Sequence, residues 1–172
     1  MMMTLKELYD STIKYAGRRR FIIDVDGKLV DIIPNVKAGI ITFRFRVKSV
    51  SRKNEGYNTW VQFYGIKYSD RPQTSDSVKI IEKDTGKPLY FERISLTNPK
   101  AKNYVRVRCA CQDFRFRFAW EDLENQCLYG GRPKSYTRKP GSNRPPVNPE
   151  HYPGFCKHIW ECLKSIQHYF AR

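Results

Sequence analysis

The sequence predicts an α+β fold in which a curved, mainly antiparallel β-meander carries a short N-terminal helix and is closed by a C-terminal helix at a Cys₃His metal site. Three observations support this class. Several segments alternate apolar and polar residues with period two and are separated by turn residues. Apolar residues recur at helical spacing only near the two ends. The chain has 172 residues, 40% of them hydrophobic and 14% aromatic, which is enough to bury one substantial core.

A short helix is expected at the N-terminus. Thr4 and Glu7 have the spacing of a capping box, and Gly17 supplies a stop. The residues that fall close to one face of this helix are Leu5, Leu8, Thr12 and Tyr15.

Strands are predicted to follow from residue 21 onward. Residues 21–25 and 28–33 flank Asp26-Gly27, a strong hairpin signal. Segments 40–48 and 59–64 alternate with period two around a polar turn at 54–56, and segments 78–81 and 89–94 bracket a turn at 84–86. Strands joined by short turns usually pair antiparallel, so we expect one curved sheet whose exposed face is basic. The last strand of this sheet is expected at 103–108.

The C-terminal helix is expected to begin after Pro153-Gly154. From there, apolar residues recur at helical spacing on one face. They are Phe155, Ile159, Leu163, Ile166 and Phe170.

The domain organisation expected from these patterns has two parts that form one compact unit. Residues 1–100 supply the N-terminal helix and the β scaffold, and residues 101–172 form a metal-binding module. The module contains an insert at 132–153 that is rich in proline and basic residues, a composition that favours extended structure over a sheet interior.

Two cysteine-containing pairs supply the ligands of a closed structural zinc site. Cys109 and Cys111 end the last predicted strand, and Cys156 and His158 open the last helix. Structural zinc is usually tetrahedral with Cys and His ligands, so this set leaves no position for water or substrate. Residues i and i+2 of a strand share a face, whereas on a helix they diverge by about 200°. Cys156 is therefore expected in the irregular first turn and His158 inside the helix.

The order C-x-C followed by C-x-H resembles the SWIM-type zinc finger. In that family the first pair ends a β-hairpin, the second pair opens a helix, and the modules bind DNA or other proteins. The resemblance covers about the last 70 residues of this chain. Here the two pairs are separated by the 44 residues 112–155, a long insert for the family. The general organisation also resembles small standalone SWIM-type proteins of large tailed bacteriophages, which implies a role in a virion or in DNA packaging.

Other residues could replace a zinc ligand. Cys127 and His151 lie in the insert, and Cys162 follows His158 by one helical turn. Cys127 and His151 have no partner at ligand spacing, and Cys162 falls on the apolar stripe, where a thiol acts as a small hydrophobe. We therefore expect all three to lie outside the site.

The five cysteines and the N-terminus indicate where the protein is made. An odd number of thiols, a strained C-x-C pair and the lack of an apolar signal segment favour synthesis in a reducing cytoplasm, with later incorporation into a virion as one option. No apolar run approaches the ~18 residues needed to span a membrane, so a membrane partner is not expected.

A formal net charge of +15 indicates acidic partners. The expected contact is nonspecific and electrostatic, with the phosphates of a nucleic acid or with an acidic protein surface, although the proline-rich insert could also be a solvated loop without a partner. In Phe114–Phe118, as in Phe43–Arg46, aromatic and basic residues alternate, which as a strand would place Phe in the core and Arg in solvent. The candidate contact residues are Arg115, Arg117, Arg132, Lys134, Arg138, Lys139, Arg144 and Lys157.

No catalytic motif is found in the sequence, so we expect a protein that is not an enzyme. Asp24 and Asp26 form a D-x-D pair of the kind that can hold magnesium, but Gly27 favours a hairpin tip. Two functions are predicted as alternatives: a zinc-stabilised protein that contacts nucleic acid through phosphate, and a structural or assembly protein that uses its zinc site and proline-rich arm for protein contacts.

Overall fold

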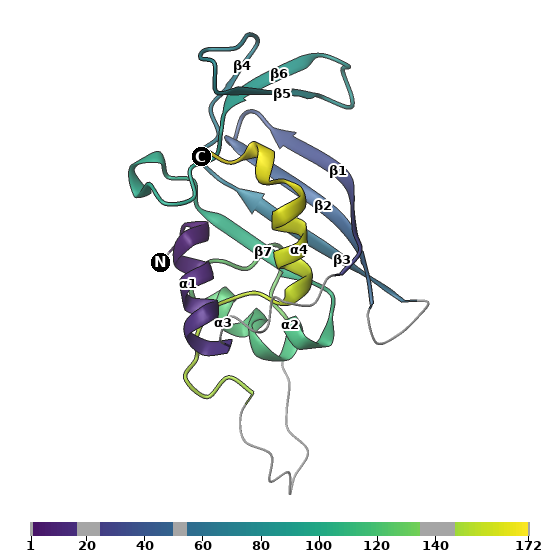
Figure 1. Ribbon diagram of the computed structural model, residues 1–172, viewed down its shortest axis with the longest axis vertical. Helices are drawn as coiled ribbons and strands as arrows, with labels where there is room; N and C mark the ends of the chain where they lie inside the picture. Colours follow the sequence, from purple (N-terminus) through teal and green to yellow (C-terminus); the bar gives the residue numbers. More distant parts are fainter. Residues whose placement is uncertain (1, 17–24, 50–54, 135–146, 172) are drawn as a thin grey trace, which may run out of the picture.

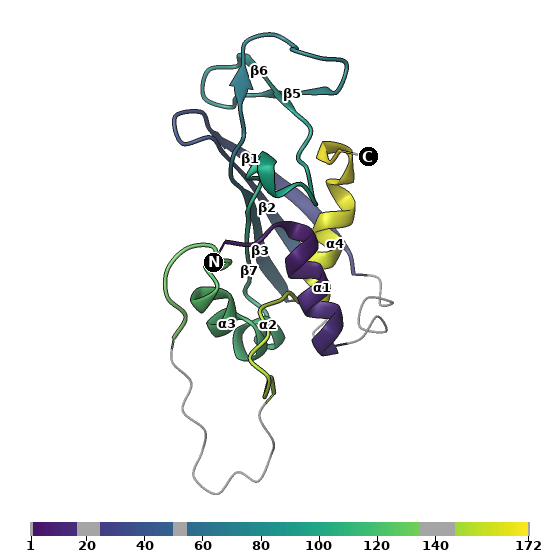
Figure 2. The same ribbon diagram turned by 90° about the vertical axis from the view of Figure 1, so that its left-hand side faces the viewer.

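The computed structural model describes residues 2–16, 25–49, 55–134 and 147–171, and it confirms the α+β class. A four-stranded antiparallel sheet forms the centre, with strand order β1-β2-β3-β7. Figures 1 and 2 show helices α1 and α4 on one face of this sheet and a smaller sheet at one end. Among the described residues, no helix has the length and apolar character needed to cross a membrane.

The central sheet is built from β1 (Gly27–Asn35), β2 (Ile40–Lys48), β3 (Gly56–Phe63) and β7 (Val105–Cys109). Its inner face is apolar because alternate residues of each strand point the same way, and cross-strand partners such as Phe43 and Val61 lie on that face. The outer face carries the intervening residues. Arg44 pairs with Trp60, and Trp60 pairs with Arg108, so one row across three strands is basic and aromatic.

The two long helices cover the inner face. Helix α1 (Leu5–Ala16) begins with the predicted capping box: the Thr4 N–H donates to Glu7 Oε2 at 2.7 Å, and the Glu7 N–H donates to Thr4 Oγ1 at 3.3 Å. Helix α4 (Lys157–Ser165) buries the predicted apolar stripe, and a 3₁₀ turn, η3 (Gln167–Tyr169), follows it.

β1, β2 and β3 form a meander as predicted, but the expectation of one continuous sheet is wrong, because the described strands form two sheets. After β3 the chain leaves the central sheet and forms β4 (Tyr68–Ser69), β5 (Ser77–Ile81) and β6 (Pro88–Glu92), in the order β4-β6-β5. The β5-β6 hairpin itself is confirmed. The chain then passes through η2 (Pro99–Ala101) to β7, which pairs with β3 because its inward Val105 and Val107 complete the central core.

The predicted turn at Asp26-Gly27 is also wrong. A two-residue hairpin of this type needs positive φ at both central residues, and neither residue has it. Gly27 instead begins β1 and pairs with Val47 of β2. The partner strand predicted for this hairpin lies largely outside the described residues, as does Asn54 of the next predicted turn.

The segment Phe114–Phe118 is helical and not a strand. Helix α2 (Gln112–Arg117) begins at Cys111, whose sulfur accepts the Phe114 N–H at 3.3 Å, and α3 (Ala119–Glu124) follows directly. At helical spacing Phe114 and Phe118 share a buried face, whereas Phe116 is 40% exposed. The cap from Cys111 and the packing of Phe114 with Phe118 therefore favour a helix here, although the period-two pattern indicates a strand.

Candidate metal centre

Four side chains from three elements meet at one end of the sheet. Cys109 is the last residue of β7, Cys111 is the N-cap of α2, Cys156 is the N-cap of α4, and His158 lies in the first turn of α4. Their ligand atoms all lie within 4.8 Å of one another. The predicted quartet therefore forms a cluster that could hold a metal ion, and Cys156 has the non-helical backbone expected for it, with φ −84° and ψ 169°.

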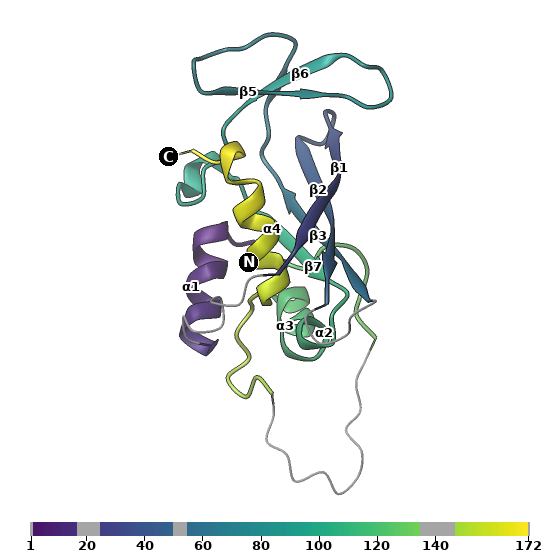
Figure 3. The same cartoon turned by 45° about the vertical axis from the view of Figure 1, so that its right-hand side comes forward.

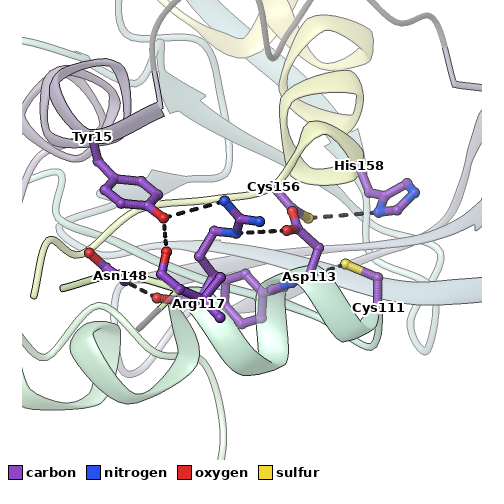
Figure 4. Close-up of polar contacts among 9 residues, drawn as sticks. Tyr15, Cys111, Asp113, Arg117, Asn148, Cys156 and His158 are labelled. Carbon is purple, nitrogen blue, oxygen red and sulfur yellow. Dashed lines mark hydrogen bonds and ion pairs between the residues drawn. The ribbon is translucent and has the colours of Figure 1, made fainter. Parts of the chain in front are cut away.

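His158 faces the sulfurs through Nδ1. This atom lies 3.8 Å from Cys109 Sγ and 3.7 Å from Cys156 Sγ; Figure 4 shows the contact with Cys156. The imidazole also contacts the Tyr57 ring, with centroids 5.0 Å apart and the two planes tilted by 50°. All four candidate ligands are buried and none is more than 5% exposed, as expected for a closed structural site.

Hydrogen bonds hold the sulfurs in place. Cys109 Sγ accepts from the Thr59 hydroxyl at 3.4 Å and from the Cys111 N–H at 3.5 Å. The Ala110 N–H donates to Asn58 O at 3.0 Å, which ties the turn between the two cysteines to β3. Donors to ligand atoms orient them and favour the thiolate form.

The surroundings shift the pKa values of the three thiols in different directions. Burial acts to raise the pKa of Cys109, but hydrogen bonds from Cys111, Cys156 and Thr59 lower it well below its ordinary value. The pKa of Cys111 is raised, mainly by its hydrogen bond to Cys109, and burial raises that of Cys156 well above its ordinary value. Because a metal needs thiolates, its binding must displace the remaining protons.

The other three candidate ligands lie outside the cluster, as predicted. The Cys127 thiol donates to Asn125 O at 3.2 Å, and burial raises its pKa to about 12. The His151 Nδ1 lies 2.8 Å from Glu121 Oε1, and the His151 side chain is exposed. Cys162 is fully buried in the α4 stripe, and burial raises its pKa.

A buried carboxyl fixes the loop that leads to Cys156. Asp122 Oδ1 accepts the Gly154 N–H at 2.8 Å, and burial raises the pKa of Asp122 well above its ordinary value. A Cβ on Gly154 would lie 2.7 Å from Thr12 Oγ1, so this position has no room for a side chain. Sequence reasoning missed Asp122, because nothing in the pattern of 119–124 separates it from the neighbouring surface acids.

The predicted basic residues divide into three groups. Arg115, Arg132 and Lys134 are exposed, and Lys157 is half-buried at the start of α4. Arg117 is used internally: Figure 4 shows its ion pair with Asp113, at 2.9 Å, and its contact with Tyr15. The remaining three, Arg138, Lys139 and Arg144, lie outside the described residues.

A groove of about 460 Å³ lies on the outer face of the sheet beside the cluster. Its lining includes Trp60, Cys109 and Ala110, so it shares part of the Cys109–Cys111 turn with the metal centre. Sequence reasoning missed this groove, although Trp60 is the only aromatic residue among the outward positions of 59–63.

Comparisons with protein-family models, with curated proteins and with solved structures find no match for this chain. The resemblance to SWIM-type zinc fingers and to bacteriophage proteins therefore stays a prediction from the Cys and His spacing.

Proposed function

We propose that the Cys₃His cluster holds a structural Zn²⁺ ion. Tetrahedral zinc with Zn–S near 2.3 Å and Zn–N near 2.05 Å separates sulfur and nitrogen ligands by about 3.6 Å. The distances from His158 Nδ1 to the sulfurs of Cys109 and Cys156, 3.8 and 3.7 Å, come close to this value. Three soft sulfur donors favour zinc over magnesium or calcium. With four buried ligands the ion would connect β7 to α4 and stabilise the fold without taking part in catalysis.

We further propose that the protein is a non-enzymatic nucleic-acid-binding protein that contacts phosphate through a basic surface. The observation that carries this proposal is the outer face of the central sheet, where Arg44, Arg46, Arg106 and Arg108 project from β2 and β7. Asp31 also reaches this row, 3.5 Å from Arg44. A basic sheet face on a chain with net charge +15 is suited to a polyanion.

An assembly protein remains the second candidate, and a specific feature favours it. β1 is an edge strand of the central sheet, and Val30 and Ile33 on it are 49% and 44% exposed. An exposed apolar edge strand can pair with a strand of another chain. In this alternative the basic residues contact an acidic protein surface.

The test is binding of the zinc-loaded protein to labelled duplex and single-stranded DNA across a salt series, with zinc counted in the same preparation. Binding at micromolar concentration or below that persists near physiological salt, with a steep dependence on salt, is the expected result. Removing two charges from the sheet face, in Arg46→Gln with Arg106→Gln, should weaken binding more than Lys79→Gln with Lys87→Gln on the β5-β6 hairpin. Binding that disappears above low salt would contradict the proposal and favour the assembly role.

A further inference from the structure

The groove beside the metal centre combines cationic and aromatic side chains. Four of its ten described lining residues are basic and none is acidic. The basic residues come from three different segments: β7, α2 and the stretch after α3. They are Arg108, Arg115, Arg132 and Lys134. No ion pair joins any of the four to a carboxylate among the residues that the structure describes.

The wall of the groove is held in place by backbone pairing. The Val107 N–H donates to Cys127 O at 2.8 Å, and the Tyr129 N–H donates to Val107 O at 3.1 Å, so the chain after α3 lies along the outer edge of β7. Arg108 then donates through Nη2 to Gly131 O, which secures the next turn. Figures 2 and 3 show this segment on the side of the sheet opposite α1 and α4.

Aromatic rings lie within and beside the groove. Trp60 is half-buried, lines the groove and stacks on Tyr129 with centroids 5.9 Å apart and planes 19° apart. The Arg132 guanidinium lies 4.9 Å from the centroid of the Trp120 ring, which is 40% exposed. These contacts hold the indole of Trp60 and the guanidinium of Arg132 in defined positions, so little side-chain freedom is lost when a ligand binds.

We infer that this groove binds single-stranded nucleic acid, with a base against Trp60 and the adjoining phosphates at Arg115, Arg132 and Lys134. This inference rests on the proposed nucleic-acid function and gives it a location and a strand preference. Stacking requires a base whose face is free, and a duplex keeps its base faces covered by neighbouring pairs. Aromatic side chains within a basic groove form the usual platform for single strands. The volume is within the range of small-ligand sites, which suits one nucleotide rather than a helix.

A second hollow on the described part of the molecule provides a matched control. It measures about 580 Å³ and is also basic, with Lys67, Lys100 and Lys102 in its lining, but it contains no aromatic residue and includes Glu92. Lys67→Gln with Lys100→Gln removes the same charge as Arg115→Gln with Lys134→Gln, at a different place. A comparison of the two pairs separates a local site from general attraction.

The experiment measures binding of labelled oligothymidylate, oligouridylate and a duplex of equal length to zinc-loaded protein at physiological salt. Trp60→Ala should weaken single-strand binding by about 5- to 150-fold and leave duplex binding nearly unchanged. Arg115→Gln with Lys134→Gln should weaken single-strand binding severalfold more than the control pair. Single strands should also quench the tryptophan fluorescence of the wild type. In Trp60→Phe, which keeps an aromatic platform, binding should persist while that quenching falls.

Two results overturn the inference. If the wild type binds DNA but neither Trp60 variant changes affinity or quenching, the nucleic-acid function holds and the groove is not its site. If the wild type binds none of the three probes, the proposed function fails and the inference fails with it.

Discussion

Removal of the metal provides the sharpest test of the Cys₃His centre. The perturbation is Cys156→Ala, with Cys162→Ala as its control. Both thiols are fully buried and both lie at α4, so the two truncations remove the same atoms from similar surroundings. Only Cys156 belongs to the ligand cluster. The difference between the variants therefore reports the metal rather than the loss of a buried sulfur.

The expected magnitude follows from linkage between metal binding and folding. Free zinc at a thousand times its dissociation constant stabilises the folded state by about 4 kcal/mol. For a chain of this size, each kcal/mol shifts Tm by about 2–4 °C, so chelation should lower Tm by about 8–16 °C. The protein should stay folded at room temperature without metal, because most of the core, including Phe43, Phe63 and Phe91, does not include the cluster.

The assay is thermal unfolding followed by far-UV circular dichroism, with and without chelator, beside a count of bound zinc. Wild type and Cys162→Ala should both bind one zinc ion and lose stability on chelation. Cys156→Ala should resemble the chelated wild type and respond little to chelator. Equal destabilisation by both substitutions, with no effect of chelator on the wild type, would refute the assignment of the cluster as a metal site.

Three further predictions address the elements around the centre. In Asp122→Asn the neutral amide should still accept the Gly154 N–H. Burial raises the folded-state pKa of Asp122, so the stability of the wild type relative to this variant should fall as pH rises from about 4 through that pKa, by up to about 1.4 kcal/mol per pH unit. Denaturant titrations at several pH values measure this difference. Gly154→Ala should cost about 1–3 kcal/mol in the same titrations, because its Cβ would meet Thr12 Oγ1 at 2.7 Å and Phe118 Cε1 at 2.9 Å, and an unchanged midpoint would show that this packing is looser than described. Phe114→Ala should lower the free energy of unfolding by about 3–5 kcal/mol and Phe116→Ala by less than about 1 kcal/mol, because the helix buries Phe114 and leaves Phe116 exposed. Similar losses for both variants would favour a strand at 114–118 over the helix.

The parts of the fold that could be predicted are those set by local sequence. The capping box of Thr4 and Glu7, the alternation in β2 and the apolar stripe of α4 depend on neighbouring residues, and all three are present. The Cys₃His cluster could also be predicted, because Cys and His pairs at this spacing are typical of metal ligands.

The parts that could not be predicted depend on distant contacts. β6 is the strand that precedes β7 in the chain, so the tendency of consecutive strands to pair would place β7 beside β6, whereas β7 pairs with the more distant β3. The alternation of aromatic and basic residues in Phe114–Phe118 is typical of a strand. The segment is helical because Cys111 caps helix α2 and Phe118 packs in the core. The groove could not be seen either, since Trp60, Arg108, Arg115 and Lys134 meet only after β3, β7, α2 and the segment beyond α3 are assembled.

The metal centre and the groove share one piece of backbone. Cys109 and Ala110 line the groove, while the Cys109 and Cys111 sulfurs point toward His158 and Cys156 on the inner side. Arg108 precedes this turn and Arg115 lies in the helix that Cys111 caps, so a metal that fixes the two cysteines would also fix the spacing of two groove cations. A structural ion placed there would contribute to binding without touching the ligand, because it would reduce the freedom that these side chains lose when a polyanion is bound.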